Sequence, residues 1–201
     1  MLPEQQRNGV TIGIVKELED PQKLGRVLVS FPLYDDQKSA WARVVAPAAG
    51  PERGVFFRPA KNDEVLVLFE QGDPRTPYVL GALWSKTAKP PAEVLPSSND
   101  IALIRSKTGQ VLRFDDKKKL VELADEKNER HVTVDTGGKK VIVEAKKGDV
   151  EVLAGSGSVT VKAAKGKVTV EARDIQLKAS NSLKLEARGK VTIKGSRVDI
   201  N

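Results

Sequence analysis

Few side chains in this sequence have the type and spacing that chemistry would need. The one histidine, His131, lies in the run His131-Val132-Thr133-Val134. Alternate residues of a strand share a face, so His131 is expected to point to solvent, away from the two valines. A metal site needs several inward-facing ligands in a defined geometry, and the sequence has no second histidine and no cysteine. We therefore predict no metal site and no other cofactor.

The paired acids Asp35-Asp36 and Asp115-Asp116 could suggest general acid–base catalysis. Adjacent residues of a strand point to opposite faces, so neither pair would present both carboxylates to one substrate. Turn positions suit these residues better. The sequence contains no phosphate-binding loop, nucleophile elbow or cluster of metal ligands. It thus predicts no catalytic residues and a protein that is not an enzyme.

Proline and aromatic residues divide the chain into two parts. All 11 prolines occur at or before Pro96, and all nine aromatic residues occur at or before Phe114. Proline lacks the amide donor that a sheet ladder requires. Aromatic rings are bulky, so their absence indicates a thin core. The composition of the C-terminal part therefore predicts a long, narrow and uninterrupted sheet.

The N-terminal part, residues 1–85, has the pattern of short strands separated by turns. The expected strands are residues 10–18, 25–31, 40–46, 64–70 and 77–83. Five short strands in this length predict a small closed or partly closed barrel. Residues 86–98 are rich in proline and predict an extended linker.

The C-terminal part, residues 99–201, repeats a short strand motif. Each copy places two aliphatic side chains on one strand face, often followed by alanine or glycine, and turn residues separate the copies. One copy cannot bury this face alone, whereas stacked copies can. The residues predicted to form this core are Val141, Val143, Val150, Val152, Val159, Val161, Val168, Val170, Ile175, Leu177, Leu183, Leu185, Val191 and Ile193.

Three architectures fit the repeat. An antiparallel meander of ten flat strands would leave apolar faces and edges exposed. A single-chain β-solenoid with about three strands per coil would give about three coils. An intertwined homotrimer would instead pair each strand with strands of the other two chains and bury the aliphatic residues on a common axis. Periodicity does not decide between solenoid and trimer, although the trimer leaves the fewest open edges.

The N-terminal part also carries an ordered set of short motifs. They are Gly13-Ile14-Val15, Asp20-Pro21, Gly25-Arg26-Val27, Trp41-Ala42-Arg43-Val44, Asp63-Glu64-Val65, Gly72-Asp73-Pro74 and Gly81, followed by Asn99-Asp100-Ile101 and Phe114-Asp115-Asp116. This set resembles the phage baseplate spike and valine–glycine repeat (VgrG) family of contractile injection systems. The resemblance implies an all-β chain, in which an oligonucleotide/oligosaccharide-binding (OB) barrel precedes an intertwined, homotrimeric, triple-stranded β-helix needle.

The same resemblance implies a structural central spike that docks on a hub or tube and punctures the envelope of a target cell. The implied partners are a separate hub or tube protein at the OB end, a tip protein with Pro-Ala-Ala-Arg (PAAR) repeats at the C-terminal end, and transiently the target membrane. The expected tip contacts are Val198, Ile200 and Asn201. Members of the family carry a hub domain before the barrel or a lysozyme domain after it, so the sequence corresponds to a short form without either.

Charge distribution supports an alternative function. Residues 1–97 carry 12 basic and 12 acidic residues, whereas residues 98–201 carry 22 and 15, which accounts for the whole net charge of +7. A basic half can indicate a polyanionic partner. The alternative is therefore a nucleic-acid-binding OB-fold protein with a basic β-rich tail, although a neutral barrel argues against nucleic acid.

The sequence also predicts where the protein is found. No apolar run approaches the ~18 residues of a membrane helix, and residues 1–9 lack the pattern of a secretory signal. We expect synthesis in the cytoplasm without a signal peptide, followed by assembly into the baseplate of a virion or of an injection particle, including particles released from the cell.

Overall fold

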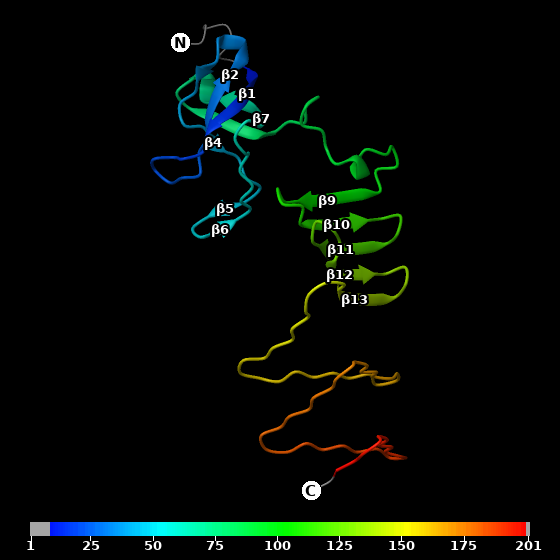
Figure 1. Cartoon of the computed structure of the whole chain (residues 1–201). Coiled ribbons are helices and arrows are strands. Elements are labelled where there is room, and N and C mark those ends of the chain that lie inside the picture. Colours follow the sequence, from blue (N-terminus) through cyan, green and yellow to red (C-terminus); the bar gives the residue numbers. More distant parts are fainter. Residues whose placement is uncertain (1–8, 200–201) are drawn as a thin grey trace. The chain divides into compact units, whose positions relative to one another are not determined.

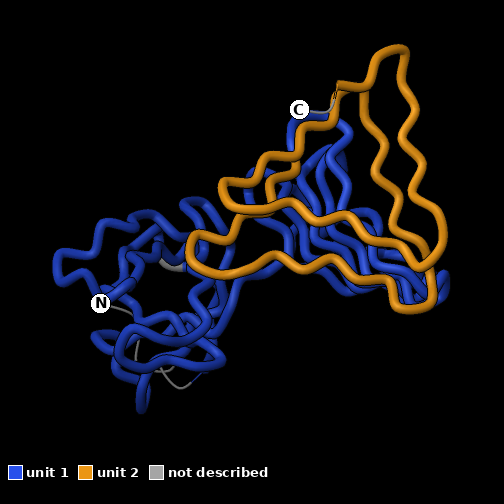
Figure 2. The backbone as a smooth tube through the Cα atoms, turned by 90° about the horizontal axis from the view of Figure 1, so that it is seen from below, with its two compact units in different colours: residues 1–149 blue, residues 150–201 orange. Residues whose placement is uncertain are grey.

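The computed structural model describes residues 9–199, and strands are its main regular elements (Figure 1). The helical elements in this range are the 3₁₀ turns η2 (Pro32–Tyr34), η3 (Glu70–Gly72) and η4 (Ala92–Val94). None of the described helices has the length and apolar character to cross a membrane. The chain divides into two compact units, Met1–Asp149 and Val150–Asn201 (Figure 2). The predicted all-β class is confirmed.

A six-stranded sheet forms the first part of unit 1. Its strands are β1 (Val10–Glu17), β2 (Leu28–Phe31), β3 (Gln37–Lys38), β4 (Arg43–Val44), β7 (Glu64–Phe69) and β8 (Pro77–Ala82), in the order β3-β2-β1-β7-β8-β4. An antiparallel bridge between Val27 and Ala42, with N···O distances of 3.0 and 2.8 Å, joins the β2 side of the sheet to the β4 side. The sheet therefore curls into a barrel, as the sequence predicted.

The barrel encloses a small core of valines and phenylalanines. Alternation in β2 and β7 directs every second side chain inward, so Val29, Phe31, Val65, Val67 and Phe69 are buried. The rings of Phe31 and Phe69 pack with centroids 5.7 Å apart at an angle of 60°. This tilted arrangement is one that aromatic pairs favour, and it anchors the two strands to each other across the barrel.

Gly13 lets β1 and β2 approach closely. A Cβ atom at this position would lie 2.2 Å from Cγ1 of the buried Val29 and 3.1 Å from the carbonyl oxygen of Ser30. Any side chain would thus push the two paired strands apart, which explains a glycine inside a strand.

The carboxylate of Asp20 holds the loop between β1 and β2. Only 2% of its side chain is exposed. It accepts hydrogen bonds from the amides of Gln22, Leu24 and Arg26, at 3.0, 2.9 and 3.3 Å. The Arg26 guanidinium donates two more, at 2.7 and 3.1 Å. These hydrogen bonds, that of the Arg26 side chain foremost, hold the pKa of Asp20 far below its usual range, although burial acts in the opposite direction.

A short hairpin lies between β4 and β7. It consists of β5 (Ala49–Gly50) and β6 (Arg53–Gly54), which pair with each other outside the six-stranded sheet. The sequence did not predict these strands, because two-residue strands carry no recognisable alternation.

The second part of unit 1 is a five-stranded antiparallel meander. Its strands are β9 (Ile101–Arg105), β10 (Val111–Asp115), β11 (Leu120–Ala124), β12 (Arg130–Asp135) and β13 (Lys140–Ala145), which lie in sequence order. Every strand pairs with its neighbours in the same chain (Figure 1). The expectation that strands of the C-terminal part pair only with other chains is therefore wrong for residues 101–145.

Aspartates spaced ten residues apart explain this local pairing. Asp115, Asp125 and Asp135 each lie where a strand of the meander ends, and each carboxylate accepts a backbone hydrogen bond within its turn. The donors are the amides of Lys118, Glu129 and Gly138, at 2.8, 2.8 and 2.6 Å. Such turns reverse the chain and favour hairpins. The next position in this series is Ala145, where the hairpins stop.

Unit 2 has a different backbone. Residues 150–199 contain no assigned strand, and every one of them is exposed. Straight runs alternate with bends at residues 155–157, 164–166, 173, 180–181, 188–189 and 196, where the sequence predicted most of its turns. Figure 2 shows these runs joined by corners into a coil, without the hairpins of the meander. No backbone–backbone hydrogen bond joins residues within this described stretch.

We expect Asp20→Asn to lower the melting temperature at neutral pH, because the amide cannot accept the same set of charge-assisted hydrogen bonds. The pKa of Asp20 is lower in the folded chain than in the unfolded chain. Its stabilisation is therefore present above pH ~4 and is lost as the pH falls from there toward the folded pKa. Melting curves between neutral and acidic pH should show a shallower acid loss for the variant than for the wild type.

The matched control is Glu17→Gln, because Glu17 forms an exposed ion pair with Lys38 at 2.7 Å. Exposed pairs contribute little, so this variant should melt like the wild type. Equal melting of Asp20→Asn and Glu17→Gln at neutral pH would contradict the role given to Asp20.

Candidate functional site

One face of the meander is an exposed apolar surface. Strand register aligns two aliphatic rows across all five strands. The first row is Ile104, Leu112, Leu123, Val132 and Val143, and the second is Ala102, Phe114, Val121, Val134 and Val141. Eight of these ten residues are exposed and the other two are half-buried. We call this set the apolar face.

The opposite face of the meander carries the charged side chains, and we call it the polar face, although it also includes the buried Val111 and Ala124. It is more deeply buried than the apolar face. Glu93 of η4 accepts hydrogen bonds from Arg105 and from Arg113, the latter at 2.6 Å, and Arg113 also donates to Glu122 at 2.9 Å. Glu122 and Thr133 are buried. The linker that the sequence predicted as extended chain thus contributes a turn and an ion pair to this face.

His131 lies on this polar face, opposite Val132 and Val134, as the alternation predicted. Its imidazole is not solvated, however, since only 8% of the side chain is exposed. Nε2 lies 3.3 Å from Glu144 on the adjacent strand, and Nδ1 is buried without a hydrogen-bond partner among the described residues. The predicted solvent exposure is wrong, because a side chain of the adjacent strand, that of Glu144, lies against the imidazole.

The structure brings together the first two of the predicted core residues. Val141 lies beside Val134, and Val143 lies beside Val132, in the register of β12 and β13. Their side chains remain 68% and 60% exposed. Within one chain these valines therefore have neighbours along the sheet, but nothing covers their face.

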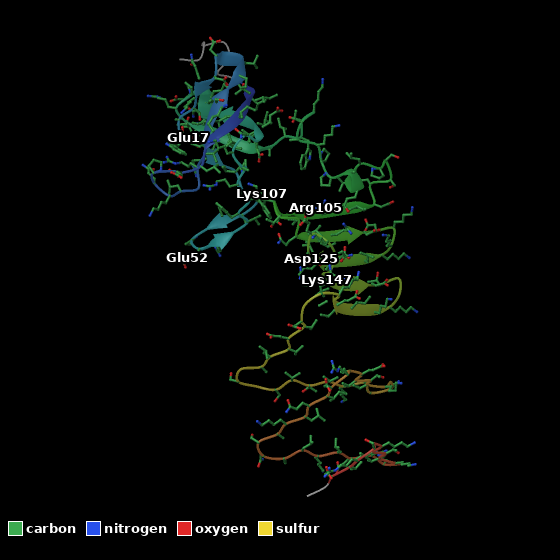
Figure 3. All side chains as sticks on the ribbon, viewed as in Figure 1. Glu17, Glu52, Arg105, Lys107, Asp125 and Lys147 are labelled. Carbon is green, nitrogen blue, oxygen red and sulfur yellow. The ribbon has the colours of Figure 1, made fainter. Side chains whose placement is uncertain are left out.

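The other predicted core residues lie on the straight runs of unit 2, where no second strand of the described chain pairs with them (Figure 3). Their exposure follows a regular pattern. The first aliphatic residue of each run is between 53% and 59% exposed, and the second is between 64% and 74% exposed. The same geometry is thus repeated in every run. These residues are Val150, Val152, Val159, Val161, Val168, Val170, Ile175, Leu177, Leu183, Leu185, Val191 and Ile193.

The predicted tip contacts lie at the end of unit 2. Val198 is 50% exposed. Ile200 and Asn201 lie outside the described residues.

The apolar face contains residues that the predicted core did not include. Phe114, Leu123 and Val132 belong to it, yet only β13 was included in the predicted core. The ten-residue spacing of the strand-ending aspartates is the signal that would have set the register of these earlier strands. The valine triplets from which the core was predicted become regular only from Val141 onward.

A hollow of about 1030 Å³ lies on the barrel beside the β5–β6 hairpin. Its aromatic lining consists of Trp41, Phe56, Phe57 and Tyr78, and its basic lining consists of Arg26, Arg43, Arg53, Arg58 and Arg75. Phe56 and Phe57 are 76% and 68% exposed. An exposed aromatic pair of this kind is typical of a surface that contacts another macromolecule.

Most of the arginines at this hollow are held by groups of the barrel itself. Arg26 is bound to Asp20, Arg75 pairs with Asp73 at 2.7 Å, and Arg58 donates to the carbonyl oxygen of Leu18 at 3.0 Å. The guanidinium of Arg43 lies 5.5 Å from the centre of the Tyr78 ring. The hydrogen bond from Tyr78 to Glu70, at 2.7 Å, raises the pKa of the phenol. These contacts stiffen the wall of the hollow.

Asp35 and Asp36 lie in a turn, as predicted, whereas Asp115 is the last residue of β10 and Asp116 begins the turn that follows. Asp35 and Asp36 both have left-handed φ angles, of 49° and 55°, and Asp36 accepts a hydrogen bond from Ser30 at 3.2 Å. Asp115 caps the turn before β11. Within residues 9–199, no group of three or more histidine and carboxylate side chains is arranged to hold a metal ion.

Comparison with known families decides what the barrel is. Residues 11–84 match the family model described as the type VI secretion system/phage-baseplate injector OB domain. These residues include β1, the closing bridge and β8. The barrel is an injector OB domain, and the chain is VgrG-like.

Curated VgrG proteins are similar to the same part of the chain. The actin cross-linking toxin VgrG1 of Vibrio cholerae is 34% identical over 91 residues, which make up 43% of this chain and 8% of that protein. The type VI secretion system spike protein VgrG2a of Pseudomonas aeruginosa is 33% identical over 102 residues, or 46% of this chain and 12% of that protein. The VgrG-like chain thus spans about a tenth of the length of these relatives.

We expect Glu93→Gln to lower the free energy of unfolding by about 2 kcal/mol. The change weakens the hydrogen bonds that Glu93 accepts from Arg105 and Arg113, and it removes a negative charge that balances the charge of Arg113. Denaturant titration followed by tryptophan fluorescence would measure the change. Glu126→Gln is the matched control, because Glu126 is an exposed turn residue of the same meander. A loss for Glu93→Gln no larger than the loss for Glu126→Gln would show that the ion pairs contribute nothing.

Proposed function

We propose that this chain is the central spike of a contractile injection machine, and that it works as a homotrimer. The injector OB domain supports a role in a baseplate or secretion spike. The observation that carries the trimer is the combination of a bare apolar face and a unit 2 without internal backbone pairing. Unpaired backbone groups and exposed aliphatic side chains require partners, and other copies of the same chain carry the matching surfaces.

In the proposed trimer, two kinds of packing follow each other along the shaft. The meanders of three chains are already complete sheets, so they would turn their apolar faces toward a common axis. The runs of unit 2 would interleave with those of the other two chains and obtain their ladder hydrogen bonds there. Each added strand lengthens such a shaft by about 4.7 Å. A closed shaft of this kind has no lateral edge and resists bending.

The proposed partners bind at the two ends of the chain. The OB domain would dock on a separate hub or tube protein, for which the exposed Phe56 and Phe57 offer contact area. The far end of unit 2, including Val198, Ile200 and Asn201, would bind a tip protein of the PAAR-repeat kind, because open strand ends need a cover. The shaft would transmit the thrust of contraction and puncture the target envelope, which it contacts transiently.

We further propose a mechanical function without catalysis, because the described residues assemble no catalytic group and the acid pairs serve as turns. The name of the Vibrio cholerae relative refers to a toxin activity of that protein, of which this chain matches 8%. We propose synthesis in the cytoplasm and assembly into an injection apparatus.

The alternative is nucleic-acid binding by the OB domain, and the hollow supplies the observation in its favour. Aromatic rings beside arginines can stack bases and neutralise phosphates. Three of the five arginines are, however, already bound to groups of the barrel. Binding of a single-stranded oligonucleotide that weakens steeply with salt would support the alternative.

The mass of the purified protein tests the proposed trimer directly. Light scattering should give three times the 21.8 kDa of one chain. A stable mass of 21.8 kDa at micromolar concentration would overturn the proposed spike, while leaving the OB domain assignment intact.

Val170→Asp tests which residues face the axis. In the proposed shaft this change places three carboxylates on one dry axis, at a cost of about 3 kcal/mol or more for each chain. We expect loss of the trimer in light scattering. Thr169→Asp introduces the same charge on the outer face of the same run and should leave the trimer intact. The facing assignment would be wrong if Val170→Asp trimerised with unchanged heat resistance.

A further inference from the structure

The straight runs of unit 2 between residues 159 and 195 share a five-residue pattern, in which two aliphatic residues and a small residue alternate with two polar positions. In five consecutive runs the fourth position holds a charged residue, and the sign of the charge alternates from each run to the next. These residues are Lys162, Glu171, Lys178, Glu186 and Lys194. All five are exposed.

The alternation is confined to this one column. In an extended run the second and fourth positions lie on the face opposite the aliphatic residues. The second positions of the same runs are Thr160, Thr169, Gln176, Lys184 and Thr192, which include a single charge. Within the described part of unit 2, no ion pair joins two of the five column residues, and Glu186 instead pairs with Lys184 of its own run at 2.6 Å.

The corners between runs differ in length, but the runs do not. Only Arg173 and Asp174 separate two neighbouring runs, whereas residues 164–167 separate another pair. Equivalent positions of successive runs can therefore be placed side by side whatever the corner length. The coil in Figure 2 has the path that such a side-by-side arrangement needs, because its runs do not fold back as hairpins.

Three interleaved coils bring successive runs of different chains together. Around a three-sided shaft with threefold symmetry, each run of one chain lies on the same side as the following run of its neighbour. Such strands are parallel and in register, so equivalent side chains lie about 4.8 Å apart. At that distance opposite charges attract each other and like charges repel.

We propose that the five residues form a ladder of alternating charge between chains, in which Lys178 lies between two glutamates of the neighbouring copies and Lys162 and Lys194 each lie beside one, and that this ladder fixes the register of the shaft. The partner is a second copy of this chain, and the inference rests on the proposed trimeric needle. Lys178 of one chain would thus lie between Glu171 of one neighbour and Glu186 of the other.

The apolar core alone cannot set this register. Every run offers nearly the same valine, isoleucine or leucine pair and the same small residue, so a chain displaced by one run would bury almost the same core. The charge column distinguishes the two arrangements. Displacement by one run sets lysine beside lysine and glutamate beside glutamate, which disfavours the wrong register.

Three full-length variants with the same net charge test the ladder. K178E places three acidic residues in a row. The reversal K162E/E171K/K178E/E186K/K194E keeps the alternation with every sign exchanged. K165E changes a corner residue outside the column. Each of them lowers the charge of the chain by two. A difference in melting temperature between them therefore reports the pairing of charges in the ladder and not the total charge of the chain.

The measurements are mass by light scattering and the melting temperature of the trimer. We expect K178E to melt roughly 5 °C or more below the wild type, while the reversal and K165E remain within about 2 °C of it. Sodium chloride at about 1 M should reduce the loss in K178E, because it screens the repulsion.

The outcomes separate this inference from the proposed function. A trimeric wild type for which K178E melts like K165E, or for which the reversal melts as low as K178E, overturns the ladder and leaves the needle standing. A monomeric wild type overturns the proposed needle and the ladder together.

Discussion

The constraint on which this structure depends is that a backbone in extended conformation must find partners for its amide and carbonyl groups. The barrel satisfies this need by closing on itself through the bridge between Val27 and Ala42. The meander satisfies it with hairpins inside one chain. Within the described residues, unit 2 does not pair its own backbone groups. Its described valine, leucine and isoleucine side chains are each at least 50% exposed. The share of backbone groups that lack a partner within the described chain therefore increases from the barrel to unit 2.

This gradient suggests how the proposed shaft assembles. The barrel and the meander can form before any second chain arrives, because their contacts lie within one chain. The apolar face would then bring three meanders together by hydrophobic burial, which needs no exact register. Only afterwards would the runs of unit 2 interleave, where register matters most and where the alternating charges lie.

Polar groups at the turns are what separates the two kinds of packing. In the meander, a strand-ending aspartate reverses the chain every ten residues and holds it with a backbone hydrogen bond. Beyond Ala145 the corners are rich in glycine, serine and basic residues, although they also include Asp149 and Asp174, and the chain continues around a coil. A small change of turn chemistry thus coincides with the change from hairpins to a coil whose runs do not pair within the described chain.

Several features could be predicted because they depend on local patterns. Alternation and turn residues in residues 1–85 predicted a barrel, and β1, β7 and β8 lie within a residue or so of their expected bounds. Asp35, Asp36 and Asp116 were correctly placed in turns, whereas Asp115 ends a strand. The β5–β6 hairpin was missed because its strands are too short to show alternation. The burial of His131 was missed because it depends on two neighbouring strands, whose register the valine pattern does not contain.

The sequence by itself determined the all-β class, the barrel and the positions of the corners, since strand periodicity, proline and glycine act over a few residues. It also determined the order of charges along unit 2. Only the tertiary structure decided that residues 101–145 pair within one chain and that their apolar face is bare while the polar face is covered. Those properties arise from register between strands, which depends on how distant residues meet and not on what each segment prefers alone.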